Sequence, residues 1–151
     1  MLIKDRAGKF LIDLDVATNL DRVNLQRADF SNLQFEGYNF SEIDLSEANF
    51  NETTLYWTYF FRANCERATF RNARLCGACL DLVNLRFADF RGAYISLDNL
   101  DSGCSLLGAD LSSAKLDGAD LRGSKYNNGT TFPHGFDPQT QGMLFDDKDL
   151  T

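Results

Sequence analysis

The chain has 151 residues, of which 44% are hydrophobic, so it is long enough to bury a core and too apolar for an intrinsically disordered protein. Its formal net charge of −7 disfavours general binding to nucleic-acid phosphates. No apolar run reaches the ~18 residues of a membrane span, and residues 1–15 lack the features of a signal peptide. We expect a cytoplasmic protein of one domain, with reduced cysteines and with no membrane or nucleic acid among its partners.

Residues 1–15 precede the repeats that fill most of the chain. They mix apolar side chains with charges, and we expect them to cap the first repeats. From residue 16 to residue 126 the sequence repeats every five residues. The centre of each repeat is Leu or Phe in nineteen of 22 cases, the exceptions being Cys65, Ile95 and Tyr126, and the residue two positions earlier is Ala in eleven. The other positions are mostly polar.

A period of five fits neither a helix nor a simple strand, whose periods are about 3.6 and 2 residues. It predicts a coil that turns a corner every five residues and points two side chains per side into a narrow interior. The segments RADFS, SEANF, LGADL and DGADL resemble the pentapeptide repeat family, whose consensus is A(D/N)LXX. The resemblance implies an all-β fold, a right-handed quadrilateral β-helix of about five coils with four repeats in each.

Residues 20 positions apart should lie above one another in such a coil. Arg27, Glu47 and Arg67 alternate in charge at this spacing and are followed by Phe87, which supports the coil without reference to any family. Residues 127–151 follow the repeats and include an ending that resembles the TxFPxGFDP motif of small cyanobacterial family members. We expect them to form a C-terminal cap with an acidic tail.

The five-residue register slips by one position between Leu100 and Leu106. We interpret the slip as a bulge of one extra residue, formed by Asp98, Asp101, Ser102, Gly103 and Cys104. Leu100 then remains a repeat centre, and Asp98 points inward, where its carboxylate accepts hydrogen bonds from the backbone of residues 102–104. The alternative is a functional insertion.

The sequence contains no phosphate-binding loop, nucleophile motif or metal-spaced Cys/His set, and its single histidine, His134, falls in the C-terminal segment. We expect neither an enzyme nor a cofactor or metal site. Cys76 and Cys79 form a CxxC motif that the register points outward. A structural role is favoured for them, and a redox pair or metal half-site is the alternative.

The segment YWTYFF, residues 56–61, is the strongest candidate for a binding site. The register points Tyr56, Trp57, Tyr59 and Phe61 outward, and Phe87 adds apolar surface on the next coil. Gly37 and Gly77 lie 20 residues to either side of Trp57 and leave space for its ring. Exposed aromatic residues at this density are typical of a protein-binding or self-association site. The alternative is packing between coils.

We therefore expect a rigid, non-enzymatic scaffold that binds a protein of unknown identity and is a monomer or a weak homodimer. The family resemblance offers an alternative, because some members protect DNA gyrase by imitating duplex DNA. The isoelectric point of about 4.6 agrees with such a mimic. Residues 61–91, however, hold six arginines against three acids, whereas a duplex is negative along its whole length.

Overall fold

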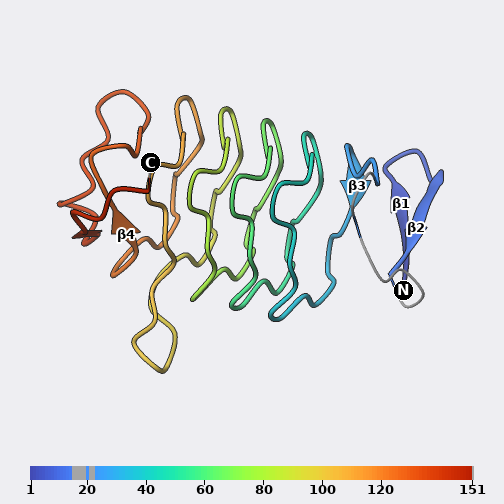
Figure 1. The fold of residues 1–151 in the computed structure, drawn as a ribbon, viewed down its shortest axis with the longest axis horizontal. Coiled ribbons are helices and arrows are strands. Elements are labelled where there is room, and N and C mark those ends of the chain that lie inside the picture. The colour runs from blue at the N-terminus through green and yellow to red at the C-terminus, as the bar shows by residue number, and fades with distance from the viewer. Residues whose placement is uncertain (15–19, 21–22, 151) are drawn as a thin grey trace.

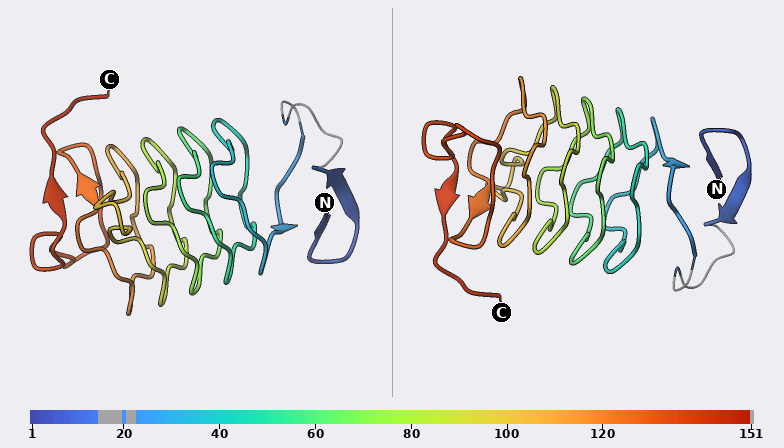
Figure 2. Two further views of the ribbon diagram at one scale, coloured as in Figure 1. Left: turned by 90° about the horizontal axis from the view of Figure 1, so that it is seen from below. Right: turned by 90° about the horizontal axis from the view of Figure 1, so that it is seen from above.

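The computed structural model describes residues 1–14, 20 and 23–150, so the expected boundary between residues 15 and 16 lies outside the described residues. The described part of the chain has no helix. Its five short strands are β1 (Leu2–Asp5), β2 (Phe10–Asp13), β3 (Ala28–Asp29), β4 (Lys125–Tyr126) and β5 (Leu144–Phe145). Between β3 and β4 the chain winds as successive coils along one axis, with a cap at each end (Figure 1 and Figure 2).

Each coil is joined to the next by single parallel bridges between residues 20 positions apart, such as Asp29 with Asn49 and Asn49 with Thr69. The backbone N–H of Phe30 donates to the carbonyl of Asn49 at 2.8 Å, and the N–H of Asn49 donates to the carbonyl of Ala28 at 2.8 Å. The same pattern recurs on each side of the coil. The fold is therefore the right-handed quadrilateral β-helix that the resemblance implies, and its coils turn a corner every five residues as the period predicts.

The corners of the coil require a left-handed backbone. The residue two positions after most repeat centres has a positive φ, which is 54° at Trp57 and 62° at Glu42. Side chains disfavour this region, and glycine occupies it at Gly37 and Gly77, where φ is 69° and 72°. At corners without glycine, the hydrogen bonds between coils offset the strain of the left-handed backbone. Even Trp57 donates its N–H to the carbonyl of Cys76 at 3.3 Å.

The interior is filled by stacked layers of repeat centres. Phe30, Phe50, Phe70 and Phe90 are fully buried, and their rings stack with centroids 4.7, 5.0 and 4.7 Å apart. Where Thr58 replaces the usual alanine, its hydroxyl donates to the carbonyl of Phe35 at 2.8 Å, so the buried oxygen is satisfied. Dry, close-packed layers of this kind are the main source of stability in the coil.

Polar ladders run along the outside of the coils. Nδ2 of Asn84 donates to Oδ1 of Asn64 at 2.9 Å, and Nδ2 of Asn64 donates to Oδ1 of Asp44 at 3.1 Å. The predicted charge column is confirmed for Arg27 and Glu47, whose Nε and Oε2 are 2.9 Å apart. It does not extend to Arg67, which pairs with its own neighbour Glu66 instead.

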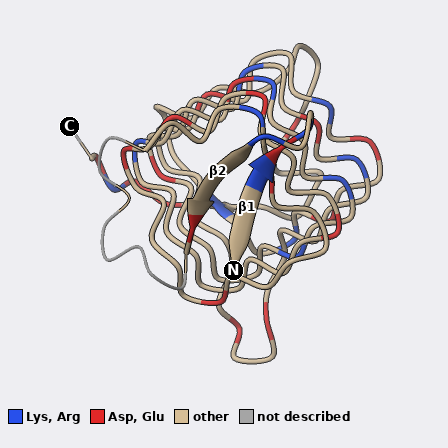
Figure 3. Cartoon of the chain, turned by 90° about the vertical axis from the view of Figure 1, so that its right-hand side faces the viewer, with Lys and Arg blue, Asp and Glu red and all other residues tan. Residues whose placement is uncertain are grey.

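Short strands close both ends of the solenoid. Ile3 and Ile12 pair across the β1–β2 hairpin and are buried against the core, and Figure 3 shows the hairpin lying across the end of the coils. At the other end β5 runs parallel to β4. The ring of Tyr126 makes edge contacts with Phe132 at 5.7 Å and Phe145 at 5.5 Å. Phe145 covers this end only in part, since it remains 52% exposed.

Removing one ring from the phenylalanine stack tests the interior. Phe70→Ala should lower the free energy of unfolding by about 3–5 kcal/mol, because it leaves a cavity between two rings in a narrow core that has little room to collapse. Urea denaturation followed by circular dichroism measures the change. A loss below about 1 kcal/mol would contradict a close-packed stack.

The Asp89 carboxylate is the best-paired acid of the coils and predicts an acid dependence. It accepts bonds from Nε and Nη2 of Arg91 at 2.9 and 2.7 Å and from Nε of Arg71 at 2.7 Å. Arg91, followed by Arg71, holds the pKa of Asp89 far below its ordinary value, although burial opposes this shift.

Because the folded pKa is depressed, the stabilisation by Asp89 is complete above the unfolded value near 4 and is lost as the pH falls below it. Asp89→Asn should therefore lower the free energy of unfolding at pH 7 by about 1.5–3 kcal/mol. The difference from wild type should narrow between about pH 4 and pH 2. The exposed substitution Asp147→Asn is the control, and an Asp89→Asn curve parallel to wild type would refute the assignment.

Candidate functional site

Trp57 lies at a corner of the coil in a column that alternates large residues with glycine. The column runs through Gly37, Trp57, Gly77, Leu97 and Gly123 in successive coils. A Cβ atom on Gly77 would lie 2.4 Å from Cδ1 of Trp57, and one on Gly123 would lie 2.4 Å from Cγ of Leu97. The indole ring thus packs closely on Gly77 through its Cδ1 and Nε1 atoms, while 40% of the residue remains exposed. Packing between coils is thus observed for this ring, whereas its role in partner binding stays a prediction.

The other aromatic residues of this segment differ in exposure. Tyr59 is 52% exposed on the adjoining side of the coil, whereas Tyr56 and Phe61 are half-buried. The rings of Tyr56 and Trp57 are tilted and 5.9 Å apart, and the guanidinium of Arg62 lies 5.0 Å from the Phe61 ring. Trp57 and Tyr59 are therefore the residues through which this segment presents aromatic surface.

Phe87 does not belong to the same surface, contrary to the sequence-based expectation. It follows Arg67 in its own corner column, and six repeats separate it from Trp57. Four repeats complete a coil, so Phe87 lies two corners away from Trp57, on the far side of the square. Its ring is flanked by the guanidinium groups of Arg67 at 4.8 Å and Arg86 at 5.7 Å.

The slip in the register is an insertion loop rather than a one-residue bulge. Cys79 pairs with Ser105 and Tyr94 with Asp120, so this coil spans 26 residues, whereas the coils before it span 20. The additional six residues leave the coil as a loop that projects from the solenoid (Figure 1). Leu100, predicted to be a buried repeat centre, is 71% exposed on this loop. A six-residue insertion and a one-residue insertion shift a five-residue register equally, so periodicity alone does not distinguish them.

Asp98 fixes the loop to Trp57. Its Oδ1 accepts hydrogen bonds from the backbone N–H of Leu100 and of Ser102, both at 2.8 Å. Its Oδ2 accepts one from Nε1 of Trp57 at 3.0 Å. The predicted bond to Ser102 is confirmed. The predicted inward orientation of Asp98 is wrong, because its carboxylate lies on the outside of the coil, against the indole.

The electrostatics of the loop agree with this arrangement. The backbone hydrogen bond from Ser102 and those from Leu100 and Trp57 hold the pKa of Asp98 below its ordinary value. The loop turns at Asp101, where φ is 57°, and rejoins the coil at Gly103. A Cβ on Gly103 would lie 2.1 Å from the carbonyl oxygen of Gly123, so this close backbone approach requires glycine. Cys104 then returns to the core and is fully buried.

The CxxC cysteines do not form an exposed pair. Cys76, expected to point outward, is buried, and its Sγ lies 3.9 Å from the carbonyl oxygen of Tyr94. Cys79 is half-buried, and burial raises the pKa of both thiols. A raised pKa suppresses the thiolate, which is the reactive form in redox and metal chemistry. Over the described ranges no three His, Cys, Asp or Glu residues are grouped as metal ligands require.

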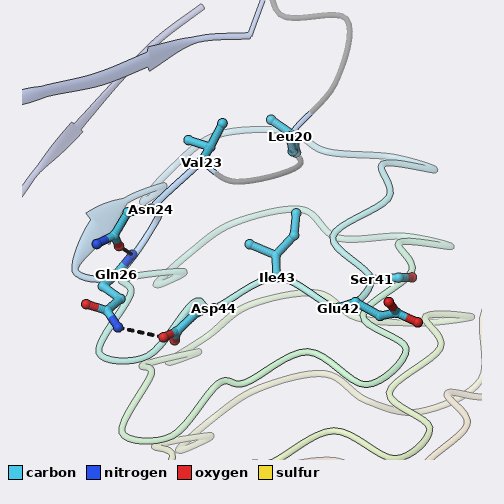
Figure 4. A pocket seen from close by; sticks show the side chains of 8 residues that line it. All are labelled: Leu20, Val23, Asn24, Gln26, Ser41, Glu42, Ile43 and Asp44. Atoms are coloured by element: carbon cyan, nitrogen blue, oxygen red, sulfur yellow. Dashed lines mark hydrogen bonds between the residues drawn. The ribbon is translucent and has the colours of Figure 1, made fainter.

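A hollow near the first coil offers no better site. It has a volume of about 470 Å³ and is lined by Leu20, Val23, Asn24, Gln26, Ser41, Glu42, Ile43 and Asp44 (Figure 4). Partial burial raises the pKa of Asp44, but hydrogen bonds from Ser46, Gln26 and Asn64 outweigh it and hold the pKa below its ordinary value. Asp44 is thus held as a structural carboxylate.

No helix in the described part of the chain is long and apolar enough to span a membrane.

The exposed surface that these residues build is here named the Trp57 corner and comprises Trp57, Tyr59, Leu97 and Leu100. The sequence indicates the two aromatic members but not the two leucines, since it places Leu100 in the core. The content of the loop, Asp98-Asn99 and Asp101-Ser102-Gly103, is typical of turns and was the available signal.

The single tryptophan of the chain reports directly on the loop. Asp98→Ala removes the acceptor for Trp57 Nε1 and for two loop amides, so we expect a shift of the fluorescence emission. We also expect roughly tenfold faster chymotrypsin cleavage at Leu97 or Leu100, because local opening becomes easier. Asn99→Ala changes an exposed side chain of the same loop, leaves these bonds in place and is the matched control. Unchanged emission and cleavage in Asp98→Ala would show that the loop is held by other contacts.

Comparison with known proteins agrees with the geometry. The profile of the family described as "Pentapeptide repeats" matches residues 17–41, 28–64, 39–77, 58–96 and 102–125. The matched ranges leave out 97–101, which belong to the insertion loop. No curated protein matches the chain.

Several solved structures are similar. A pentapeptide repeat protein from Nostoc PCC 7120 shares 29% identity over 72% of this chain and 84% of its own, with a TM-score of 0.65. HetL, from Nostoc sp. strain PCC 7120, shares 25% identity over 83% of this chain and 64% of its own, with a TM-score of 0.52. QnrB1 shares 22% identity over 78% of this chain and 64% of its own, with a TM-score of 0.55, which shows a common fold. This chain thus spans less than two thirds of HetL and QnrB1. The repeated sequence, the coils and these matches together show that the chain belongs to the pentapeptide repeat family.

Proposed function

We propose that this protein is a non-enzymatic scaffold that binds a protein partner through the Trp57 corner. The observation that carries the proposal is the exposure of Leu100, at 71%, on a loop that Asp98 orders. Its carboxylate accepts two hydrogen bonds from the loop backbone and one from the indole of Trp57. Holding a large apolar side chain in water on an ordered loop does not stabilise the free protein. Burial of that side chain by a partner would stabilise the complex.

The solenoid supports this role physically. Its interior is filled by stacked side chains, so chemistry is available only on the outer surface. The bridges between coils make that surface rigid, and a preorganised surface loses little conformational entropy on binding. HetL is described as involved in the regulation of heterocyst differentiation, and a regulatory role is compatible with binding.

DNA mimicry has less support. Arg67 and Arg86 flank Phe87, while Arg71 and Arg91 share the single carboxylate of Asp89, so the middle coils carry a basic belt. A surface that imitates the phosphates of a duplex should be negative along its length. We also propose a cytoplasmic location, supported by four free cysteines, and fractionation of the native host tests it.

Two substitutions at the Trp57 corner test the function. Proteins captured from the native host by the wild-type chain should be lost or reduced with Trp57→Ala and with Leu100→Asp. With the purified partner, either change should raise Kd by at least about tenfold, because each removes a central apolar contact. Phe87→Ala alters a ring of nearly the same exposure as Trp57, 41% against 40%, on the far side of the coil and should bind normally.

The folded state of each variant is checked by its melting curve. Capture of the same proteins by wild type and both variants would refute the proposal. Inhibition of gyrase supercoiling that survives both substitutions would favour the mimic instead.

A further inference from the structure

Both ends of the solenoid expose large apolar side chains. In the N-terminal hairpin, Ile3 and Ile12 face the core, while Leu2 and Phe10 are 61% and 56% exposed. Lys4 pairs with Phe10, so base and ring lie on the same face of the hairpin. Because the hairpin lies across the end of the coils (Figure 3), this outer face points along the axis. Caps of solenoids are normally polar on that face, since an apolar one invites stacking.

Phe145 occupies the corresponding place at the C-terminal end. It pairs with Tyr126 in the parallel β4–β5 ladder, so it continues a column of repeat centres by one layer. The Tyr126 ring contacts it on one side at 5.5 Å. Its 52% exposure marks the position where the next layer of a longer solenoid would pack. A second molecule is able to supply that layer.

The two ends differ in charge. Residues 1–14 contain three bases, Lys4, Arg6 and Lys9, against two acids, which makes the hairpin positive in a chain of net charge −7. Both acids are engaged locally: Asp5 accepts the backbone N–H groups of Ala7 and Lys9 at 2.9 and 2.8 Å, and Asp13 binds the amine of Met1 at 2.8 Å. Residues 137–150 contain four acids, Asp137, Asp146, Asp147 and Asp149, against Lys148. Asp146 lies 3.8 Å from Lys125 of β4, and with this base included the end still has a net negative charge.

We propose that copies of this protein associate head to tail, with the C-terminal cap of one copy on the outer face of the next copy's hairpin. Contact between like ends would oppose bases to bases or acids to acids, whereas contact between unlike ends joins opposite charges over an apolar centre. Two different surfaces form a heterologous interface, which repeats without closing. The product is a short rod of variable length. The interface is distinct from the Trp57 corner, so this proposal stands independently of the function proposed above.

Sedimentation velocity of the full chain tests the association. At low ionic strength the weight-average mass should rise with protein concentration and pass twice the monomer mass. Salt at about 0.5 M should reduce it, because charges at the interface are screened. A wild-type chain that stays monomeric at every concentration, or that stops at a dimer, overturns the proposal.

Two neutral substitutions determine which ends meet. Phe10→Gln and Phe145→Gln should each prevent association with itself, and an equimolar mixture should form a dimer and nothing larger, since one intact head then meets one intact tail. Tyr94→Gln is the matched control, because Tyr94 is a 51% exposed ring on the side of the solenoid, and it should associate as wild type.

Self-association of Phe10→Gln alone would show tail-to-tail contact, and that of Phe145→Gln alone head-to-head contact; either result overturns the proposal. Because Phe145 also contacts Tyr126, the double substitution Lys4→Glu and Lys9→Glu serves as a second probe at exposed positions. It should weaken the association at least about tenfold at low ionic strength, and no effect would count against the model of opposite charges.

Discussion

The structure depends on one constraint, the pairing of each residue with the residue one coil away. Parallel bridges such as Asn49 with Thr69 fix this distance at 20 residues, and the inward side chains are thereby stacked on their equivalents in the next coil. Any change in chain length must therefore be expelled from the coil. The insertion loop shows this: six residues leave the solenoid, and Cys79 still pairs with Ser105 on the same side.

The same constraint decides where chemistry is possible. Each side of the coil contributes its centre and its small partner to a dry interior, so no space remains there for a ligand. On the sides, the polar side chains hydrogen-bond to one another in ladders such as that of Asn64 with Asn84. The corners are different, because their left-handed backbone projects a side chain outward at every fifth residue. Trp57 lies at such a corner, and Leu97 occupies the equivalent position two coils later, where the insertion loop begins. The proposed binding surface therefore gathers there.

Glycine leaves space at this corner for large side chains. Gly77 and Gly123 lie beneath Trp57 and Leu97, so these large side chains rest on backbone rather than on other side chains. Asp98 then links Trp57 to the insertion loop, because its carboxylate accepts hydrogen bonds from the indole N–H and from the backbone N–H of Ser102. The ends of the solenoid carry a second kind of surface, which exists because a stack of layers has no natural last layer. Side and end are thus separate surfaces, and the two proposed contacts, with a partner and with another copy, do not compete for the same residues.

The five-residue period by itself determined the coil and its inward Phe and Leu columns, because a local rule repeats along most of the chain. The 20-residue turn followed from the family resemblance and from the alternating charges at that spacing. The same rule identified Trp57 and Tyr59 as outward. The rule failed where the position of a residue depends on the three-dimensional arrangement of the coils. Phe87 lies two corners from Trp57, and Cys76 is buried although its register points outward. Leu100 and Asp98, predicted to point inward, lie outside the core. A period fixes positions only modulo five, so the number of residues in the loop, and the contact of Asp98 with a ring 41 residues earlier, were decided by tertiary packing alone.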